Sequence, residues 1–177
     1  MQDAGCEFHI PLAFCLQNRE ISGIRHENTF REYIGMLKNA FLLDVLSRYS
    51  PSLKVQASYS KKAYAVDTAF TMLGKRKGED TGRILENMVY LHLKRKNDVY
   101  FLKNTKEVDF IVCRGLQPIK LVNVRYEAEK KETINREVDS LLYFGKMYKT
   151  PLEFVSVYPA RVPHGISSHL AHRYLCK

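Results

Sequence analysis

The stretch EVDFIVCRGLQPIKLVNVRY, residues 107–126, predicts two neighbouring strands joined by a turn at RGLQP. Both halves are dominated by apolar residues, which is typical of strands that are buried on both faces. Glu107 and Asp109 alternate at the start of the first strand and therefore share one face of it. A buried carboxylate needs a partner or an ion. We therefore expect Asp109 to mark either a binding site or a structural ion pair.

The segments on either side of this stretch predict an α/β layer. Apolar residues at three- and four-residue spacing predict helices over residues 83–96 and 130–148. Residues 98–102 and 152–158 read as strands, and residues 167–175 as a short C-terminal helix. A helix, three strands in a meander, a crossover helix and a further strand make a mixed sheet flanked by helices.

Residues 28–67 predict a helix followed by a two-stranded ribbon. Thr29 and Glu32 have the spacing of a capping box, and apolar residues then recur at helical spacing as far as residues 39–43. The strand-like segments FLLDVLSRY and KAYAVD are separated by the polar, turn-rich segment SPSLKVQASYSKK. A helix leading into such a ribbon is typical of the end of a winged helix.

The chain carries a surplus of positive charge. Its 28 Lys and Arg residues against 19 Asp and Glu residues give a formal net charge of +9. This surplus favours a polyanionic partner, either nucleic acid or an acidic protein surface. We expect the ribbon tip and the charged loop after the ribbon to contact nucleic-acid phosphates. The candidates are Lys54, Lys61, Lys62, Lys75, Arg76 and Lys77.

The cysteines and the longest apolar run limit the class of protein. The four cysteines include no CxxC pair, which argues against a disulfide framework and predicts a reducing, cytoplasmic location. The run IPLAFCL is too short to span a bilayer, so we expect no membrane partner. The segment GKRKGED lacks the GxxxxGK[ST] pattern, so this chain holds no P-loop.

The order of elements and their acidic residues resembles the core of the PD-(D/E)XK nuclease superfamily. Residues 62–177 resemble the nuclease-like C-terminal domain of archaeal and bacterial AAA-type ATPases, and residues 28–60 resemble the winged-helix segment before it. We therefore expect a winged-helix-like segment over residues 1–61 and a nuclease-like domain over residues 62–177. The matching pieces are KKAYAVDTAF, GRILENMVYLHLKRK, VYFLKNTKEVDFIV and IKLVNVRY. The resemblance implies a restriction-endonuclease-like mixed sheet in an α/β fold.

The resemblance also implies a site for one or two Mg²⁺ ions, which activate water for attack on a phosphodiester. Glu86 matches the helix glutamate of that site and Asp109 the strand aspartate, and these two are the candidate metal ligands. Asn123 and Arg125 stand where an acid and a lysine belong. Asn123 lacks the charge that Mg²⁺ sites rely on, and Arg125 stays protonated and cannot act as a base. We therefore expect a vestigial site with no cofactor, and its candidate residues are Glu86, Glu107, Asp109, Asn123 and Arg125.

Each of these residues also has a purely structural interpretation. Glu86 would pair with Arg83 or lie exposed on its helix, and Glu107 would be a solvated strand end. Arg125 would neutralise Asp109 across the two strands as a structural ion pair.

Three functions remain open on the sequence. The first is a non-catalytic module that binds double-stranded DNA or docks to an ATPase core or a like subunit. The second is a Mg²⁺-dependent DNase in which Lys120 or Glu127 replaces the missing pair. The third is an interaction or dimerisation domain that forms homo-oligomers or binds an acidic partner.

Overall fold

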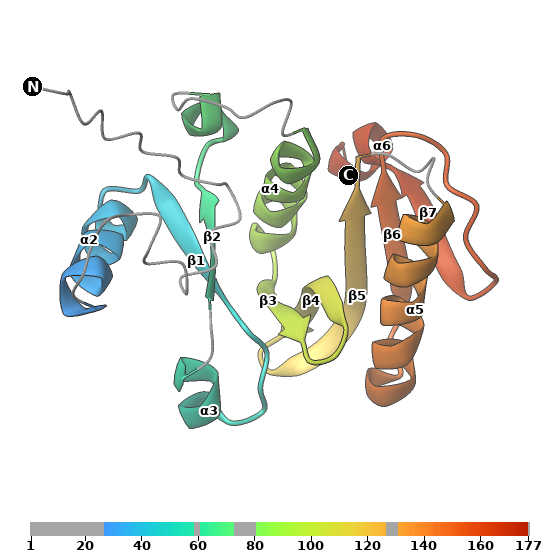
Figure 1. Ribbon diagram of the computed structural model, residues 1–177, viewed down its shortest axis with the longest axis horizontal. Coiled ribbons are helices and arrows are strands. Elements are labelled where there is room, and N and C mark those ends of the chain that lie inside the picture. Colours follow the sequence, from blue (N-terminus) through green and yellow to red (C-terminus); the bar gives the residue numbers. More distant parts are fainter. Residues whose placement is uncertain (1–26, 59–60, 73–80, 127–130, 177) are drawn as a thin grey trace, which may run out of the picture.

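The computed structural model describes residues 27–58, 61–72, 81–126 and 131–176 (Figure 1). Its elements, in chain order, are α2 (Glu27–Asn39), β1 (Leu43–Ser47), α3 (Leu53–Ser58), β2 (Lys61–Ala65), the 3₁₀ helix η1 (Thr68–Met72), α4 (Thr81–Lys94), β3 (Asp98–Lys103), β4 (Glu107–Arg114), β5 (Gln117–Arg125), α5 (Lys131–Tyr148), β6 (Leu152–Ser156), β7 (Ile166–Leu170) and α6 (Ala171–Leu175). None of the described helices is both long and apolar enough to cross a membrane.

The main sheet has five strands in the order β3-β4-β5-β6-β7. The first three strands form the predicted antiparallel meander, and β6 and β7 then pair in parallel. Gly115, at φ +63°, lies in the tight turn between β4 and β5, where a residue with a Cβ would be strained. Helix α5 makes the crossover from β5 to β6, so the predicted mixed sheet flanked by helices is confirmed.

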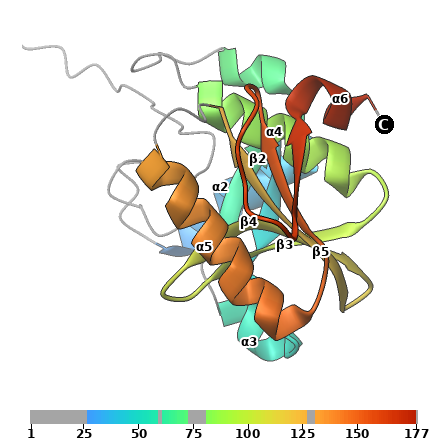
Figure 2. The same ribbon diagram turned by 90° about the vertical axis from the view of Figure 1, so that its right-hand side faces the viewer.

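The sheet separates two hydrophobic cores (Figure 2). On one face, α4 and α6 pack through side chains such as Val89 and Tyr174. On the other face, α5 packs through Val138 and Leu141. The fully buried strand residues confirm that β4 is covered on both sides.

The ribbon of β1 and β2 packs onto the α4 side of this layer. Leu46 and Tyr64 belong to the core under α4, and both are 1% exposed. Arg48 forms a bridge to Phe101 at the edge of β3. The domain boundary that we expected lies after residue 61, at the start of β2. Leu46 before this boundary and Tyr64 after it belong to the same hydrophobic core.

The N-terminal region confirms the helix and the ribbon but differs in detail. Thr29 lies inside α2, which already begins at Glu27, so the predicted capping box is wrong. The segment expected to be a polar turn contains α3. The winged-helix identity of this region stays a prediction.

The predicted C-terminal helix over residues 167–175 is wrong in its first half. Ile166–Leu170 forms β7, and only Ala171–Leu175 is helical. The reason is tertiary: β6 offers an open edge, and the backbone of residues 166–170 pairs with it in parallel.

Candidate functional site

A bulge in β4 aims the Asp109 side chain. Tyr100 pairs with Ile111 and Leu102 with Val108, so two β4 residues face the single residue Phe101. Val108 and Ile111 consequently pack in the same core. In a regular strand, two residues that are three positions apart would lie on opposite faces. The bulge turns Asp109 toward α4 and β2.

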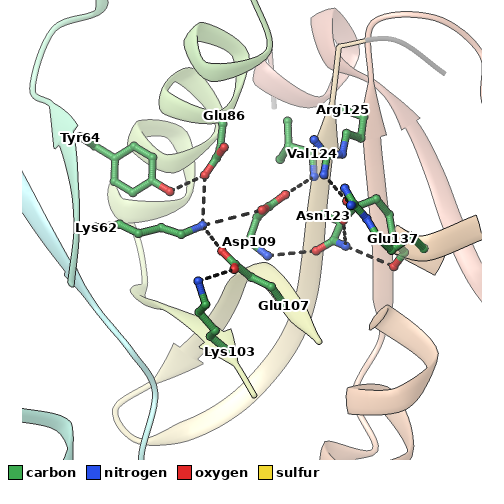
Figure 3. Close-up of polar contacts among 11 residues, drawn as sticks. Lys62, Tyr64, Glu86, Lys103, Glu107, Asp109, Asn123, Val124, Arg125 and Glu137 are labelled. Atoms are coloured by element: carbon green, nitrogen blue, oxygen red, sulfur yellow. Dashed lines mark hydrogen bonds and ion pairs between the residues drawn. The ribbon is translucent and has the colours of Figure 1, made fainter. Parts of the chain in front are cut away.

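Lys62 of β2 lies among the acidic residues that the sequence singled out (Figure 3). Its Nζ atom is 2.8 Å from Glu107 Oε1, 3.5 Å from Glu86 Oε1 and 3.9 Å from Asp109 Oδ1. The Lys62 side chain is only 12% exposed. We call Lys62, Tyr64, Glu86, Glu107 and Asp109 the Lys62 cluster.

Further contacts orient the carboxylates of the Lys62 cluster. The Tyr64 hydroxyl donates a hydrogen bond to Glu86 Oε1 at 2.6 Å, and Lys103 Nζ lies 3.2 Å from Glu107 Oε2. The backbone N–H of Val124 donates to Asp109 Oδ2 at 2.9 Å. Glu86 is thus bound to Lys62 and Tyr64, and it is neither exposed nor dependent on Arg83 alone.

The charges of the cluster shift one another's protonation. Burial by itself lowers the pKa of Lys62, but Glu86, Asp109 and Glu107 together raise it above its usual value. Burial raises the pKa of Asp109 from 3.8 to about 7, with Glu86 adding to this shift and Lys62 opposing it. Burial raises the pKa of Glu107, but Lys62 and Lys103 lower it below its usual value. Lys62 therefore stays protonated at neutral pH and serves as an internal counterion.

Asn123 and Arg125 face the other side of β5 and meet Glu137 of α5 (Figure 3). Asn123 Nδ2 donates to Glu137 Oε2 at 2.7 Å, and Arg125 forms an ion pair with Glu137 Oε1. Arg136 Nη2 lies 3.5 Å from Glu137 Oε1. We call Glu137, Asn123, Arg125 and Arg136 the Glu137 cluster.

The two clusters meet at Asp109 and Asn123, next to the paired residues Phe110 of β4 and Val122 of β5. The backbone N–H of Asp109 donates to Asn123 Oδ1 at 3.0 Å, and the Asp109 carboxylate accepts from the Val124 N–H of the neighbouring strand. Arg125 makes its ion pair with Glu137, so the expected direct pairing of Arg125 with Asp109 is wrong. Asp109 finds its cation in Lys62 instead.

Sequence reasoning missed the role of three residues. Glu137 lies on the buried stripe of α5, three residues after Ile134 and four before Leu141, and an acid at such a position signals a buried contact. Lys62 and Tyr64 alternate on β2, so the burial of Tyr64 brings Lys62 to the same face. The basic charge of Lys62 by itself predicts only a phosphate contact.

The remaining candidates lie elsewhere. Lys54 is exposed on α3, and Lys61 is half-buried at the start of β2. Lys120 lies 2.9 Å from Glu153 Oε2 and from the Tyr174 hydroxyl, in a separate cluster. The positions of Lys75, Arg76, Lys77 and Glu127 are outside the described residues.

Replacing Asp109 with asparagine is expected to stabilise the chain at alkaline pH. The pKa of Asp109 is about 7 in the folded chain against 3.8 for a free side chain. The folded state therefore binds more protons between these values, and the free energy of unfolding falls as the pH rises through this window. Asparagine can still accept from Val124 and carries no charge. We expect Asp109→Asn to raise the free energy of unfolding at pH 8 by roughly 2 kcal/mol, because the lost attraction to Lys62 offsets part of the gain.

Urea denaturation at pH 5, 6, 7 and 8 measures this effect. The wild-type chain should lose stability across the series relative to Asp109→Asn. The pKa of Glu107 is lowered, so Glu107 stays ionised from pH 5 to pH 8 and its titration does not contribute to the measured change. If the free energy of unfolding depended on pH in the same way in both proteins, the raised pKa of Asp109 would be contradicted.

Comparisons with known proteins leave the family open. No family model matches the chain, and no solved structure matches it. A protein of Haemophilus influenzae described as uncharacterized is 32% identical over 127 residues. The match covers 69% of this chain but only 30% of the length of that protein.

Proposed function

We propose that this chain is a non-catalytic module that binds double-stranded DNA or docks to a partner, built on a degenerate PD-(D/E)XK-type core. One observation carries the non-catalytic part: the Lys62 ammonium group lies within 4 Å of all three carboxylates that the sequence assigned to the site. A protonated lysine there neutralises the acids that a divalent ion would need.

The residues do not fit a magnesium ion. Among the residues that the structure describes, no group of three or more His, Cys, Asp or Glu side chains is placed to hold a metal. Lys62 Nζ would repel a divalent cation among the acids of its cluster. Asn123 turns its amide group toward Glu137, so a carboxylate at position 123 would meet a second carboxylate there.

The order of elements supports the nuclease-like part of the proposal. Helix α4, the meander β3-β4-β5, the crossover helix α5 and β6 follow one another as that superfamily resemblance implies. In the Haemophilus influenzae relative, the matched segment is 30% of a longer chain. This supports a module that works as one part of a larger protein, which we propose to be an AAA-type ATPase.

Exposed apolar side chains support the docking part of the proposal. Tyr33 and Met36 of α2 are 50% and 62% exposed, and Phe41 in the turn after α2 is 77% exposed. Phe41 also has φ +55°, which is uncommon for an aromatic residue. Tyr33 and Met36 are three residues apart on α2 and so share one face of it, and neighbouring exposed apolar groups often mark protein contacts.

A plasmid-nicking assay tests the non-catalytic part. With about 10 mM Mg²⁺ or Mn²⁺, we expect the chain to nick the plasmid no more than the buffer alone does, because Lys62 blocks metal binding. The Asp109→Asn variant is the matched control, since it removes one acid and keeps the hydrogen bond to Val124. Metal-dependent nicking that disappears in Asp109→Asn would show a nuclease.

A second candidate, the DNase with displaced catalytic residues, is favoured by one observation. Glu137 brings a carboxylate to the side chain of Asn123 from α5, and Lys62 brings an amino group to Asp109. If the nicking assay is positive, Glu137→Gln should then abolish nicking as completely as Asp109→Asn does.

A further inference from the structure

The described basic side chains differ in how far their charge is already neutralised. Lys62 is bound by three carboxylates and Lys120 by Glu153. The run Lys94, Arg95 and Lys96, at the end of α4 and in the turn after it, is exposed. None of these three side chains forms an ion pair with another described residue. Their charge is therefore available to a ligand.

Helix α6 packs against α4 (Figure 2), and this contact includes His92 in the last turn of α4. The Tyr174 ring of α6 lies 5.6 Å from the His92 ring of α4 and 5.4 Å from the His169 ring of β7. Arg173, next to Tyr174, is exposed. The contact between Tyr174 and His92 brings α6, which carries Arg173, to the last turn of α4.

The His92 imidazole reports the local field. Burial lowers the pKa of His92, and Arg95, Lys120 and Lys96 lower it further. Its Nδ1 atom has no hydrogen-bond partner among the described residues. Of the cations that act on His92, Lys120 is paired with Glu153, whereas Arg95 and Lys96 form no ion pair with another described residue.

We propose that the end of α4, with Lys94, Arg95 and Lys96, together with Arg173 of α6, is the surface that binds the phosphate groups of a DNA backbone. This inference rests on the DNA-binding part of the proposed function and gives it a location. It moves the contact surface away from the ribbon tip and the Lys62 cluster. Arginine and lysine at a helix end bind backbone phosphates without reading bases, so the binding is expected to be independent of sequence.

Fluorescence anisotropy with a duplex of mixed sequence tests the location. The double variant Arg95→Gln/Lys96→Gln changes residues beyond the last residue of α4, so the helix itself is preserved. The matched control is Lys146→Gln/Lys149→Gln, which removes two exposed charges at the end of α5. Each lost phosphate contact should lower the slope of log K against log salt by about 0.9. We therefore expect a slope smaller by about 2 and binding weaker by about 10-fold or more in the first variant only.

Three further measurements identify the ligand. Adding the duplex should shift the imidazole NMR signals of His92, which Arg95, Lys96, Lys120 and Tyr174 surround. Inorganic phosphate at the same phosphate concentration should shift them less, since a free ion engages fewer of the cations. A polyglutamate peptide of equal charge should compete poorly, and competition as strong as that of DNA would overturn the proposal in favour of an acidic protein partner.

The outcomes separate this inference from the proposed function. If the wild-type chain binds the duplex and Arg95→Gln/Lys96→Gln binds equally well, the location is wrong and the DNA-binding function stands. If Lys54→Gln weakens DNA binding and the α4 variant does not, then the contact lies at α3, between β1 and β2, and the proposed location is overturned. Absence of wild-type binding at low salt would overturn both.

Discussion

Replacing Lys62 with methionine is expected to lower the free energy of unfolding by about 3–5 kcal/mol, the range for removing one partner of a buried ion pair. The Lys62 side chain is 12% exposed and is the cation shared by Glu86, Glu107 and Asp109. Methionine fills a similar volume, so the loss reports charge more than packing. Without the ammonium group, three carboxylates face one another in a partly buried site.

Lys103→Met is the matched control for this prediction. Lys103 also pairs with Glu107, but its side chain is 51% exposed. Exposed pairs contribute about 0–1 kcal/mol, so this variant should be nearly neutral in urea denaturation. A loss below about 1 kcal/mol in Lys62→Met would mean that water, and not Lys62, neutralises the acids.

The same variant tests why the described part of the chain places no group of acids to hold a metal ion. If Lys62 takes the place of a cation, then its removal should let Mn²⁺ or Ca²⁺ stabilise the Lys62→Met variant while leaving the wild-type chain unaffected. Thermal denaturation with millimolar metal, and with Lys103→Met in parallel, measures this. Equal shifts of the melting temperature in all three proteins would show that the metal acts elsewhere.

The second large effect is expected at Glu137. The Glu137 side chain is 7% exposed, and it accepts from Asn123 Nδ2 and pairs with Arg125 and Arg136. Glu137→Leu introduces an apolar side chain of similar size and leaves Arg125 without its carboxylate partner. We expect the free energy of unfolding to fall by about 3–5 kcal/mol, measured by urea denaturation.

A double-mutant cycle separates charge from packing at this position. Replacing both members of a buried pair with apolar residues is often close to neutral. Arg125→Met in the Glu137→Leu background should therefore recover at least half of the loss. Arg136→Ala is the control, because Arg136 is 72% exposed and its removal should change stability by less than about 0.5 kcal/mol. No recovery in the double variant would show that Glu137 acts mainly through Asn123.

Local patterns predicted most of the α/β layer. The apolar runs around 107–126 predicted β4 and β5, and helical spacing predicted α4 and α5, because these segments bury continuous faces. Patterns were weaker where the buried face is short. The apolar residue Met88 of α4 is 40% exposed, whereas the polar residue Asn87 is fully buried and hydrogen-bonds the backbone of Ala65.

The sequence by itself determined which chemical groups are present: two acids at the start of β4, a glutamate on α4, and Asn123 and Arg125 on β5. Only the tertiary structure decided how they are paired. The bulge in β4 rotates Asp109 toward Lys62, and α5 brings Glu137 to Asn123 and Arg125. Strand parity and helical spacing describe one element at a time, whereas a bulge and the docking of a ribbon depend on strands far apart in the chain. For that reason the acids of this site are neutralised by a lysine that lies 47 residues before Asp109 in the sequence.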